Sequence, residues 1–292
     1  MRTGVVVLPE WPHEQAAAIW SLIEELGFDH AWTYDHLSWR DLGQKPWYGT
    51  VPVLAGAALA TSRIRLGTLV ASPNFRHPAP FSREIMTLDE ISGGRFTAGL
   101  GSGAGRGADS RILGGQPWRL AERTERFAEF VEMLDRLLTS PVTTHAGRYY
   151  QVAGMPNIPG CVQQPRVPFA IAGASDSAMR LAARYGSAWV TPGEPARAKT
   201  RDLAARVAAV HDQVRRLAEA CSAQGRDPAE LDKILLAEPA GERPLDQPEA
   251  FGDLARAYAD AGITDLVLHY PRDSEPFAGT VAALERLAGA RI

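Results

Sequence analysis

The sequence contains little cysteine and no long apolar run. Its two cysteines, Cys161 and Cys221, lie far apart and form no CxxC pair, so neither a disulfide framework nor a zinc site is expected. The longest apolar stretch, residues 51–60, is much shorter than the roughly 18 residues that a membrane-spanning helix needs. The first ten residues contain a proline and a glutamate, which come too early for a signal peptide. These features predict a protein of the reducing cytoplasm that does not enter a membrane.

The sequence also lacks a strong charge of one sign and several well-known hydrolase motifs. It has 31 lysines and arginines against 34 aspartates and glutamates, a net charge of −3, which makes no case for a nucleic-acid partner. Neither a Walker loop nor a G-x-S-x-G elbow occurs, so P-loop NTPases and α/β-hydrolases are not favoured. The first apolar run, VVVL at 5–8, carries no H-x-H pair, and we therefore expect no catalytic metal.

What the sequence does contain is one pattern repeated eight times: a short apolar run, a polar loop and an amphipathic helix. The runs are nearly continuous and rich in branched or aromatic residues, as expected for parallel strands buried on both faces. They occupy residues 4–8, 30–34, 64–70, 96–100, 169–172, 188–191, 234–237 and 266–269. Eight such units predict an α/β fold, a (β/α)8 TIM barrel that forms a single domain over residues 1–292. Because active sites of that fold lie at the C-terminal strand ends, the residues after each run are the candidates for chemistry.

The helices between these runs are predicted from apolar spacing and from glycine and proline stops. We expect them at residues 12–26, 51–60, 81–91, 120–138, 177–185, 196–224, 248–261 and 277–287. Residues 101–115 are dense in glycine and are expected to form a loop. An insertion, approximately residues 141–168, interrupts the repeat between the fourth helix and the fifth strand. We interpret it as carrying a short hairpin, either as a functional lid or as a packed surface excursion.

Two strand ends offer groups suited to a redox site. Asp35 and His36 follow the second run, and an imidazole beside a carboxylate at a barrel mouth suits proton or hydride chemistry. The alternative is an aspartate that caps a turn, next to a surface histidine. Leu69 and Val70 end the third run, where they either support a flat ring or belong to the ordinary core.

Two glycine-rich turns follow the fourth and fifth runs. The first, Gly101-Ser102-Gly103, is only weakly similar to a dinucleotide fingerprint, because no helix opens directly after it. Its glycines either permit the close approach of a ligand or form a flexible loop. The second, Gly173-Ala174-Ser175, leads straight into a predicted helix. The N–H groups of that helix start and the serine hydroxyl suit a phosphate, although Ser175 also suits a simple helix cap.

Several motifs resemble the bacterial-luciferase-like superfamily, in order and along nearly the whole chain. TLDEISGGR at 87–95 leads into GLGSG at 99–103, and Asp35-His36 and LGT at 66–68 precede them. The resemblance implies a TIM barrel with an insertion after the fourth helix, and a flavin or deazaflavin bound at the C-terminal strand ends. The motifs are most similar to those of the branch that uses the deazaflavin coenzyme F420.

The same resemblance implies roles for individual residues. Asp35 and His36 would approach the ring, with His36 as the acid/base or hydride-site residue, and Leu69 and Val70 would form a bulge under it, often through a non-proline cis peptide bond. Further cofactor contacts are implied for Gly101, Ser102 and Gly103 at the ring edge and ribityl chain, for Gly173, Ala174 and Ser175 at the phosphate, and for Thr191. One position departs from the pattern. Where the sugar-phosphate dehydrogenases of this branch carry a glutamate, this chain has Ala104, which puts sugar-phosphate oxidation in doubt.

Together these features predict an F420-dependent oxidoreductase that transfers a hydride between the cofactor and a small organic substrate. The main alternative is an FMN-dependent monooxygenase supplied by a separate flavin reductase, and a third reading is a flavin-binding protein without turnover. The resemblance also implies a homodimer through the second and third helices, and residues 55–60 offer a small-residue face for it.

Overall fold

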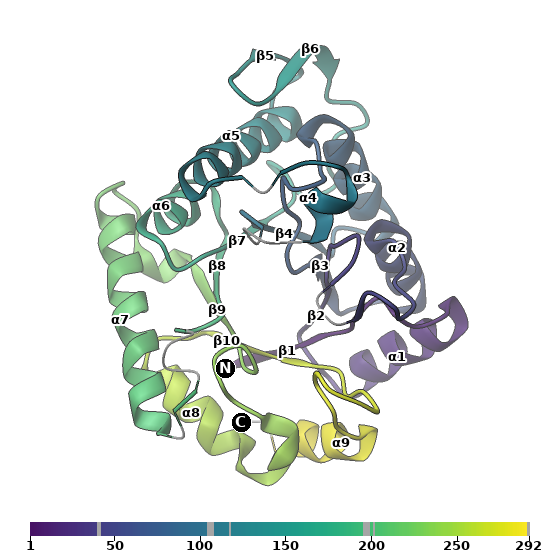
Figure 1. The fold of residues 1–292 in the computed structure, drawn as a ribbon, viewed down its shortest axis with the longest axis vertical. Helices are drawn as coiled ribbons and strands as arrows, with labels where there is room; N and C mark the ends of the chain where they lie inside the picture. Colours follow the sequence, from purple (N-terminus) through teal and green to yellow (C-terminus); the bar gives the residue numbers. More distant parts are fainter. Residues whose placement is uncertain (40–41, 104–107, 117, 195–198, 201, 291–292) are drawn as a thin grey trace.

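The computed structural model describes residues 1–39, 42–103, 108–116, 118–194, 199–200 and 202–290. Eight parallel strands of this part of the chain close into a barrel in the order β1-β10-β9-β8-β7-β4-β3-β2, and helices surround them (Figure 1). The strands are β1 (Arg2–Val6), β2 (His30–Thr33), β3 (Arg65–Thr68), β4 (Phe96–Gly101), β7 (Phe169–Ala172), β8 (Ala188–Thr191), β9 (Asp232–Leu236) and β10 (Asp265–His269). The predicted TIM barrel is confirmed, and each apolar run overlaps one of its strands.

The helices largely follow the prediction. They are α1 (His13–Glu25), α2 (Thr50–Ala60), α3 (Pro78–Ile91), α5 (Leu120–Thr139), α6 (Asp176–Tyr185), α7 (Leu203–Ser222), α8 (Phe251–Asp260) and α9 (Val281–Gly289). The prediction of a loop throughout residues 101–115 is wrong, because α4 (Ala108–Ile112) forms there. Residues 196–198 and 201 of the predicted sixth helix lie outside the described residues. The last helix starts at Val281 rather than at Phe277, whose φ of 72° is incompatible with a right-handed helix.

Side chains of the strands alternate between the barrel interior and the helix layer, as the period of two requires. Trp32 of β2 and Val267 of β10 belong to an apolar cluster that fills the barrel. Their neighbours Ala31 and Leu266 belong to a larger cluster that includes the buried faces of the surrounding helices. Because both faces of each strand are covered, the strands appear in the sequence as continuous apolar runs.

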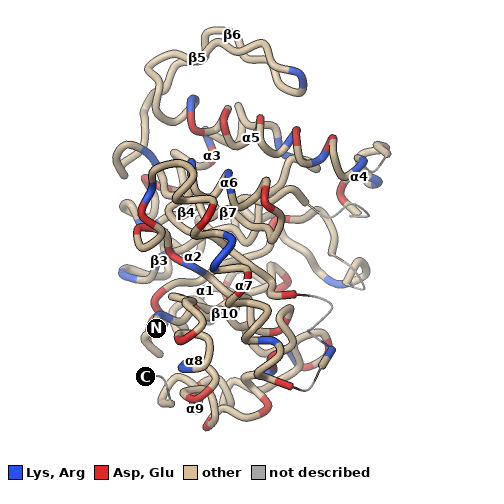
Figure 2. The backbone as a smooth tube through the Cα atoms, turned by 90° about the vertical axis from the view of Figure 1, so that its left-hand side faces the viewer, with Lys and Arg blue, Asp and Glu red and all other residues tan. Residues whose placement is uncertain are grey.

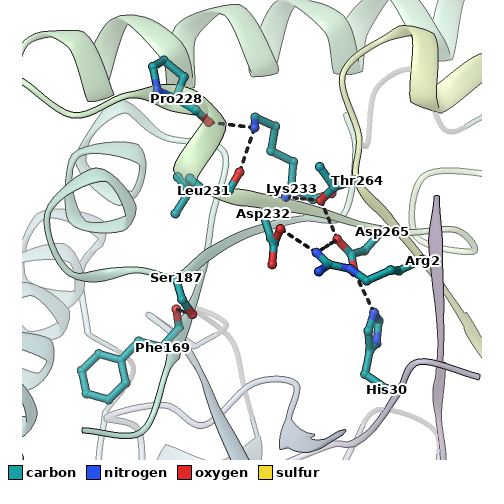
Figure 3. Close-up of polar contacts among 10 residues, drawn as sticks. All are labelled: Arg2, His30, Phe169, Ser187, Pro228, Leu231, Asp232, Lys233, Thr264 and Asp265. Atoms are coloured by element: carbon teal, nitrogen blue, oxygen red, sulfur yellow. Dashed lines mark hydrogen bonds and ion pairs between the residues drawn. The ribbon is translucent and has the colours of Figure 1, made fainter. Parts of the chain in front are cut away.

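A polar cluster closes the N-terminal end of the barrel (Figure 3). The guanidinium of Arg2 on β1 donates to both carboxylate oxygens of Asp265 on β10, at 2.7 and 2.8 Å. Trp32 donates to Nδ1 of His30 at 2.7 Å, so the proton of this imidazole lies on Nε2, 3.0 Å from the same carboxylate. Burial alone would raise the pKa of Asp265, but the hydrogen bonds from His30 and Arg2 hold it well below its usual range. This cluster ties β1, β2 and β10 together at the end opposite the expected site.

The insertion contains the predicted hairpin. Strands β5 (Val142–Ala146) and β6 (Gln151–Pro156) pair antiparallel, and two views place them outside the helix ring, beyond α5 (Figures 1 and 2). Arg83 of α3 donates to the carbonyl of Pro156 at 2.7 Å, which holds the hairpin against the flank of the barrel. This position favours the packed excursion over the lid.

Helix α5 carries charges of both signs along its length and an apolar stripe on its buried side. Figure 2 shows basic and acidic residues mixed along α5, whose buried side, from Phe127 to Leu138, carries the apolar stripe expected of an amphipathic helix. Within the described residues, every helix is too short or too polar to cross a membrane.

Candidate active site

The chain directly after β2 presents His36 at the mouth of the barrel, which is formed by the C-terminal strand ends. The imidazole is 21% exposed, and its Nδ1 lies 2.8 Å from Oδ2 of Asp109. The other carboxylate oxygen accepts a hydrogen bond from the backbone N–H of Leu37 at 2.8 Å. Because a carboxylate can only accept, the proton of the neutral imidazole lies on Nδ1. Among the residues that the structure describes, no hydrogen bond engages Nε2, which is therefore the nitrogen that a ligand can meet.

Asp109 is a residue of this site that the sequence analysis missed. It lies in the first turn of α4 (Figure 1), and only 1% of its side chain is exposed. Its two hydrogen bonds tie α4 to the loop after β2, which gives a physical reason for a helix of five residues directly after a glycine-rich stretch. A buried carboxylate that fixes the orientation and tautomer of a histidine is a common arrangement for a general base. We call His36 and Asp109 the dyad.

The carboxylate of Asp35, the residue before His36, is bound by an arginine of the loop after β3. It is completely buried, and its oxygens accept hydrogen bonds from Arg76 at 3.0 and 2.8 Å. Arg76 also pairs with Glu84 of α3 at 2.7 Å. Burial lowers the pKa of Arg76, but the hydrogen bonds that it donates to Asp35 and the negative charges of Asp35 and Glu84 together raise the net pKa. The carboxylate of Asp35 thus anchors the β2 loop to the loop before α3.

The end of β3 forms the implied bulge. The peptide bond between Leu69 and Val70 is cis, as the resemblance implies. Leu69 is 5% exposed and packs into the barrel, whereas Val70 is half-buried and lies against Gly101 of β4. A Cβ added at Gly101 would lie 2.5 Å from Cγ2 of Val70, so the glycine lets the bulge and β4 approach closely.

The turn after β4 lies beside the bulge and is partly accessible. Ser102 and Gly103 are half-buried. Gly103 has a φ of 71°, and a side chain there would collide with the amide of Asn74 in the loop after β3. The positive φ favours glycine at this position, and a side chain there would also have to displace the amide of Asn74. Ala104, where the chain departs from the sugar-phosphate dehydrogenase pattern, lies outside the described residues.

The turn after β7 caps α6, as one of the two readings predicted. Ser175 accepts a hydrogen bond from the backbone N–H of Ala178 at 3.3 Å and lies 3.0 Å from the hydroxyl of Ser177. Arg216 of α7 donates to the carbonyl of Ala174 at 3.3 Å and pairs with Asp176. The turn therefore combines a helix start, two hydroxyl groups and a nearby guanidinium, which together suit an anion.

Thr191 at the end of β8 is fully buried and serves the scaffold. Its hydroxyl donates to Oε1 of Gln213 on α7 at 2.6 Å and accepts from the backbone N–H of Gly193 at 3.1 Å. With these partners the hydroxyl fixes the start of the loop that follows β8.

A second hydrogen-bonded group lies at the same end of the barrel. Tyr34 of the β2 end contacts His269, the last residue of β10, and His269 contacts Glu238, which follows β9. The sequence analysis did not single out Tyr34, His269 or Glu238 as site residues. These residues are far apart in the sequence, since 235 positions separate Tyr34 from His269 and 31 separate His269 from Glu238. The sequence alone therefore gives no sign that they contact one another.

Comparison with known proteins finds relatives over the whole chain. The profile of a family described as luciferase-like monooxygenase matches residues 1–286. An F420-dependent glucose-6-phosphate dehydrogenase of Beutenbergia cavernae is 30% identical over 316 aligned positions, which cover 91% of this chain and 89% of that protein. A 4-hydroxyprotoasukamycin monooxygenase of Streptomyces nodosus subsp. asukaensis is 33% identical over 63% of this chain and 48% of its own length. The solved F420-dependent tetrahydromethanopterin reductase of Methanopyrus kandleri shares the fold, with a TM-score of 0.79 and 18% identity over 99% of this chain and 98% of that one.

Proposed function

The chain belongs to the luciferase-like monooxygenase family, and from that premise we propose that it is an F420-dependent oxidoreductase. It transfers a hydride between the C5 carbon of the deazaflavin and a small organic substrate. The observation that carries the proposal is the dyad: a partly exposed histidine at the barrel mouth, oriented by a buried carboxylate. The full-length similarity to an F420-dependent dehydrogenase supports the choice of cofactor.

The residues at the mouth fit a flat ring with a phosphate-bearing tail. The half-buried Val70 offers an apolar face, and the turn at Ser102 lies beside it. The hydroxyl of Ser72, just after the bulge, is buried without a hydrogen-bond partner in the described structure. A buried hydroxyl of this kind needs a partner, and the polar edge of a deazaflavin ring would supply one.

We assign the cofactor contacts on this basis. Leu69 and Val70 support the ring face, Gly101, Ser102 and Gly103 follow its edge and the ribityl chain, and Gly173, Ala174 and Ser175 hold the phosphate near Arg216. Asp35 and Thr191 remain in the cofactor site as residues that hold its loops in place, because their polar atoms bind Arg76 and Gln213. His36 is the residue that meets the ring and the substrate.

The chemistry divides between cofactor and protein. When bound, F420 accepts or donates the hydride. The protein orients the substrate, and Nε2 of His36 holds or moves a proton at the reacting atoms while Asp109 keeps the other ring nitrogen protonated. A positioned acid or base of this kind typically contributes about 10²–10⁴-fold to a rate.

The second candidate is an FMN-dependent monooxygenase supplied with reduced flavin by a separate reductase. The similarity to a named monooxygenase over 63% of this chain favours it. The same bulge, glycine turn and anion-binding turn would serve FMN, because both cofactors carry a flat tricyclic ring and a phosphate. We do not extend the first proposal to sugar phosphates, because Ala104 stands where such dehydrogenases carry a glutamate.

The experiment that tests the proposal is a parallel titration of the purified protein with F420 and with FMN. Quenching of protein fluorescence by F420 at lower concentrations than by FMN is expected. Preferential binding of FMN, with oxygen consumption when reduced FMN is added, would instead establish the monooxygenase. The substitution Ser175→Ala should weaken the binding of both F420 and FMN if the phosphate binds at this turn.

The proposal also covers location and assembly. We propose that the protein acts in the cytoplasm, which its two free cysteines support. We further propose a homodimer through α2 and α3, supported by Leu59 on α2, a large apolar side chain that is 78% exposed. A sedimentation experiment on the purified protein measures this directly.

A further inference from the structure

Three residues from neighbouring parts of the barrel form a continuous hydrogen-bonded chain under the mouth. The hydroxyl of Tyr34 lies 2.7 Å from Nε2 of His269, and Nδ1 of His269 lies 2.8 Å from Oε2 of Glu238. The other oxygen of Glu238 accepts from the backbone N–H of His269 at 3.0 Å. Tyr34 and His269 are 6% and 1% exposed. We call these residues the relay.

The hydrogen-bonding chemistry of the relay fixes where its protons lie. The carboxylate of Glu238 can only accept, so Nδ1 of His269 carries the imidazole proton. Nε2 then offers its lone pair, and the hydroxyl of Tyr34 donates to it. Enzymes that activate a hydroxyl group use the same order of groups. A hydroxyl donates to an imidazole, and a carboxylate stabilises the imidazolium that forms when the proton is transferred.

The relay is shielded on one side by aromatic rings. Phe277 stacks on the imidazole of His269, with centroids 3.5 Å apart and planes 4° apart, and Trp39 stacks on Phe277 at 5.9 Å. Phe277 holds a φ of 72°, a conformation that non-glycine residues rarely adopt. Arg272 stabilises this loop by binding the carboxylate of Glu10 and by donating to the carbonyl of Pro276 at 2.8 Å. Water therefore has little access to His269 from this side.

On its other end the relay borders a cavity, and Tyr34 borders the dyad. Glu238 and Phe277 line a cavity of about 310 Å³ whose walls include Arg243 and Glu275, two side chains that are 53% and 63% exposed. The ring of Tyr34 meets that of His36 edge-on, with centroids 6.2 Å apart. The chain of groups thus connects the candidate reaction centre with the surface.

We propose that Tyr34, His269 and Glu238 remove the hydroxyl proton of an alcohol or hemiacetal substrate during its oxidation by F420. The inference rests on the proposed function. As the C–H bond breaks and its hydrogen and electron pair pass to C5 of the deazaflavin, the substrate O–H bond breaks and a C=O bond forms. The substrate proton passes to the oxygen of Tyr34 while the proton of Tyr34 passes to Nε2 of His269. The resulting imidazolium is stabilised by Glu238, from which the proton leaves through the cavity. Within the relay, Tyr34 is the catalytic group that takes the hydroxyl proton, and His269 and Glu238 are positioning residues; His36 keeps its place beside the cofactor ring.

The first arm of the test needs neither cofactor nor substrate. Nitrogen-15 NMR of the imidazole rings, with His269→Gln to assign the signal, reports which nitrogen carries the proton. We expect the Nδ1–H tautomer in the wild type and a shift of the Nε2 signal alone in Tyr34→Phe. An Nε2–H tautomer, or a signal unaffected by Tyr34→Phe, would overturn the relay.

The second arm measures F420 reduction with a panel of secondary alcohols and sugar hemiacetals. Tyr34→Phe should lower kcat by about 100-fold or more, with little change in KM or in the Kd for F420, and Glu238→Gln should show a smaller loss in kcat alone. The matched control is Tyr258→Phe, which removes a different buried tyrosine hydrogen bond, 2.7 Å long, from Tyr258 of α8 to Glu242. This variant should leave kcat unchanged. If Tyr34→Phe keeps its kcat within threefold, Tyr34 is not the base. If the wild type fails to bind F420, the proposed function is lost, and the NMR arm still decides whether the relay exists.

Discussion

The hydrogen bond between Asp109 and His36 makes Asp109→Asn an informative perturbation. Asparagine has the shape of aspartate, and its carbonyl oxygen can still accept from the backbone N–H of Leu37. Its NH2 group then faces Nδ1 of His36, 2.8 Å away in the native site, and favours the tautomer that carries the proton on Nε2. The nitrogen that meets the ligand changes from acceptor to donor, so we expect turnover to fall by about 10²–10⁴-fold.

The loss of folding stability in Asp109→Asn should be small in comparison with the loss of turnover. A charge-assisted hydrogen bond becomes a neutral one, which lowers the free energy of unfolding by about 1–2 kcal/mol and Tm by about 2–8 °C. Cofactor binding should change little, because the bulge and the anion-binding turn are untouched. The assays are thermal unfolding, F420 titration and single-turnover hydride transfer.

The control for this variant is Asp89→Asn. Asp89 is as buried as Asp109 and accepts hydrogen bonds from the backbone and side-chain amides of Gln163, at 3.0 and 2.7 Å. Its substitution should lower Tm by a similar amount and leave turnover intact. If Asp109→Asn retains wild-type turnover while it binds F420, the carboxylate does not set the tautomer of a reacting histidine, and the assignment of the dyad is wrong.

Three further substitutions test the scaffold and the assembly. Burial raises the pKa of Asp265, but hydrogen bonds, first of all that from His30, hold it low in the folded protein. The free energy of unfolding that Asp265→Asn loses should therefore be largest above about pH 4 and should shrink as the pH falls through the lower folded pKa. Urea unfolding at several pH values measures this loss. A pH-independent loss would refute this linkage. Gly101→Ala places a Cβ 2.5 Å from Cγ2 of Val70 and should lower the free energy of unfolding by about 1–3 kcal/mol and weaken F420, measured by denaturation and titration. Leu59→Glu puts a charge at the proposed dimer contact and should yield a monomer by sedimentation, whereas an unchanged mass would exclude α2 from the interface.

The sequence predicts the barrel well because burial on both faces leaves a direct signature. The ranges 169–172 and 188–191 coincide with β7 and β8, since these short strands have no exposed face to interrupt the apolar run. The start of α9 was predicted too early, because Phe277 packs on His269 in a left-handed conformation. Local periodicity carries no information on such a tertiary contact.

The candidate site was predicted only in part, for a related reason. His36 and the bulge at Leu69 and Val70 lie at strand ends, which the fold alone marks as the place for chemistry. Asp109 lies on a helix that tertiary hydrogen bonds hold in place. The polar atoms of Asp35 and Thr191 turn toward Arg76 and Gln213, because a buried carboxylate or hydroxyl must find a partner. Sequence position shows that a residue is near the mouth, and not which way its side chain points.

Two histidines at the mouth are each hydrogen-bonded to a carboxylate, and they differ in how far they are buried. His36 is 21% exposed and His269 only 1%. A histidine that contacts a ligand needs an accessible ring nitrogen. A histidine that only transfers a proton within the protein does not need to be accessible, and its hydrogen bonds are stronger where water is excluded. Under the proposed function, His36 is the histidine that contacts the cofactor and substrate directly, and His269 acts only through Tyr34, whose ring lies against both imidazoles. Substitution of His36 should accordingly alter ligand binding as well as turnover, while substitution of His269 should alter turnover alone.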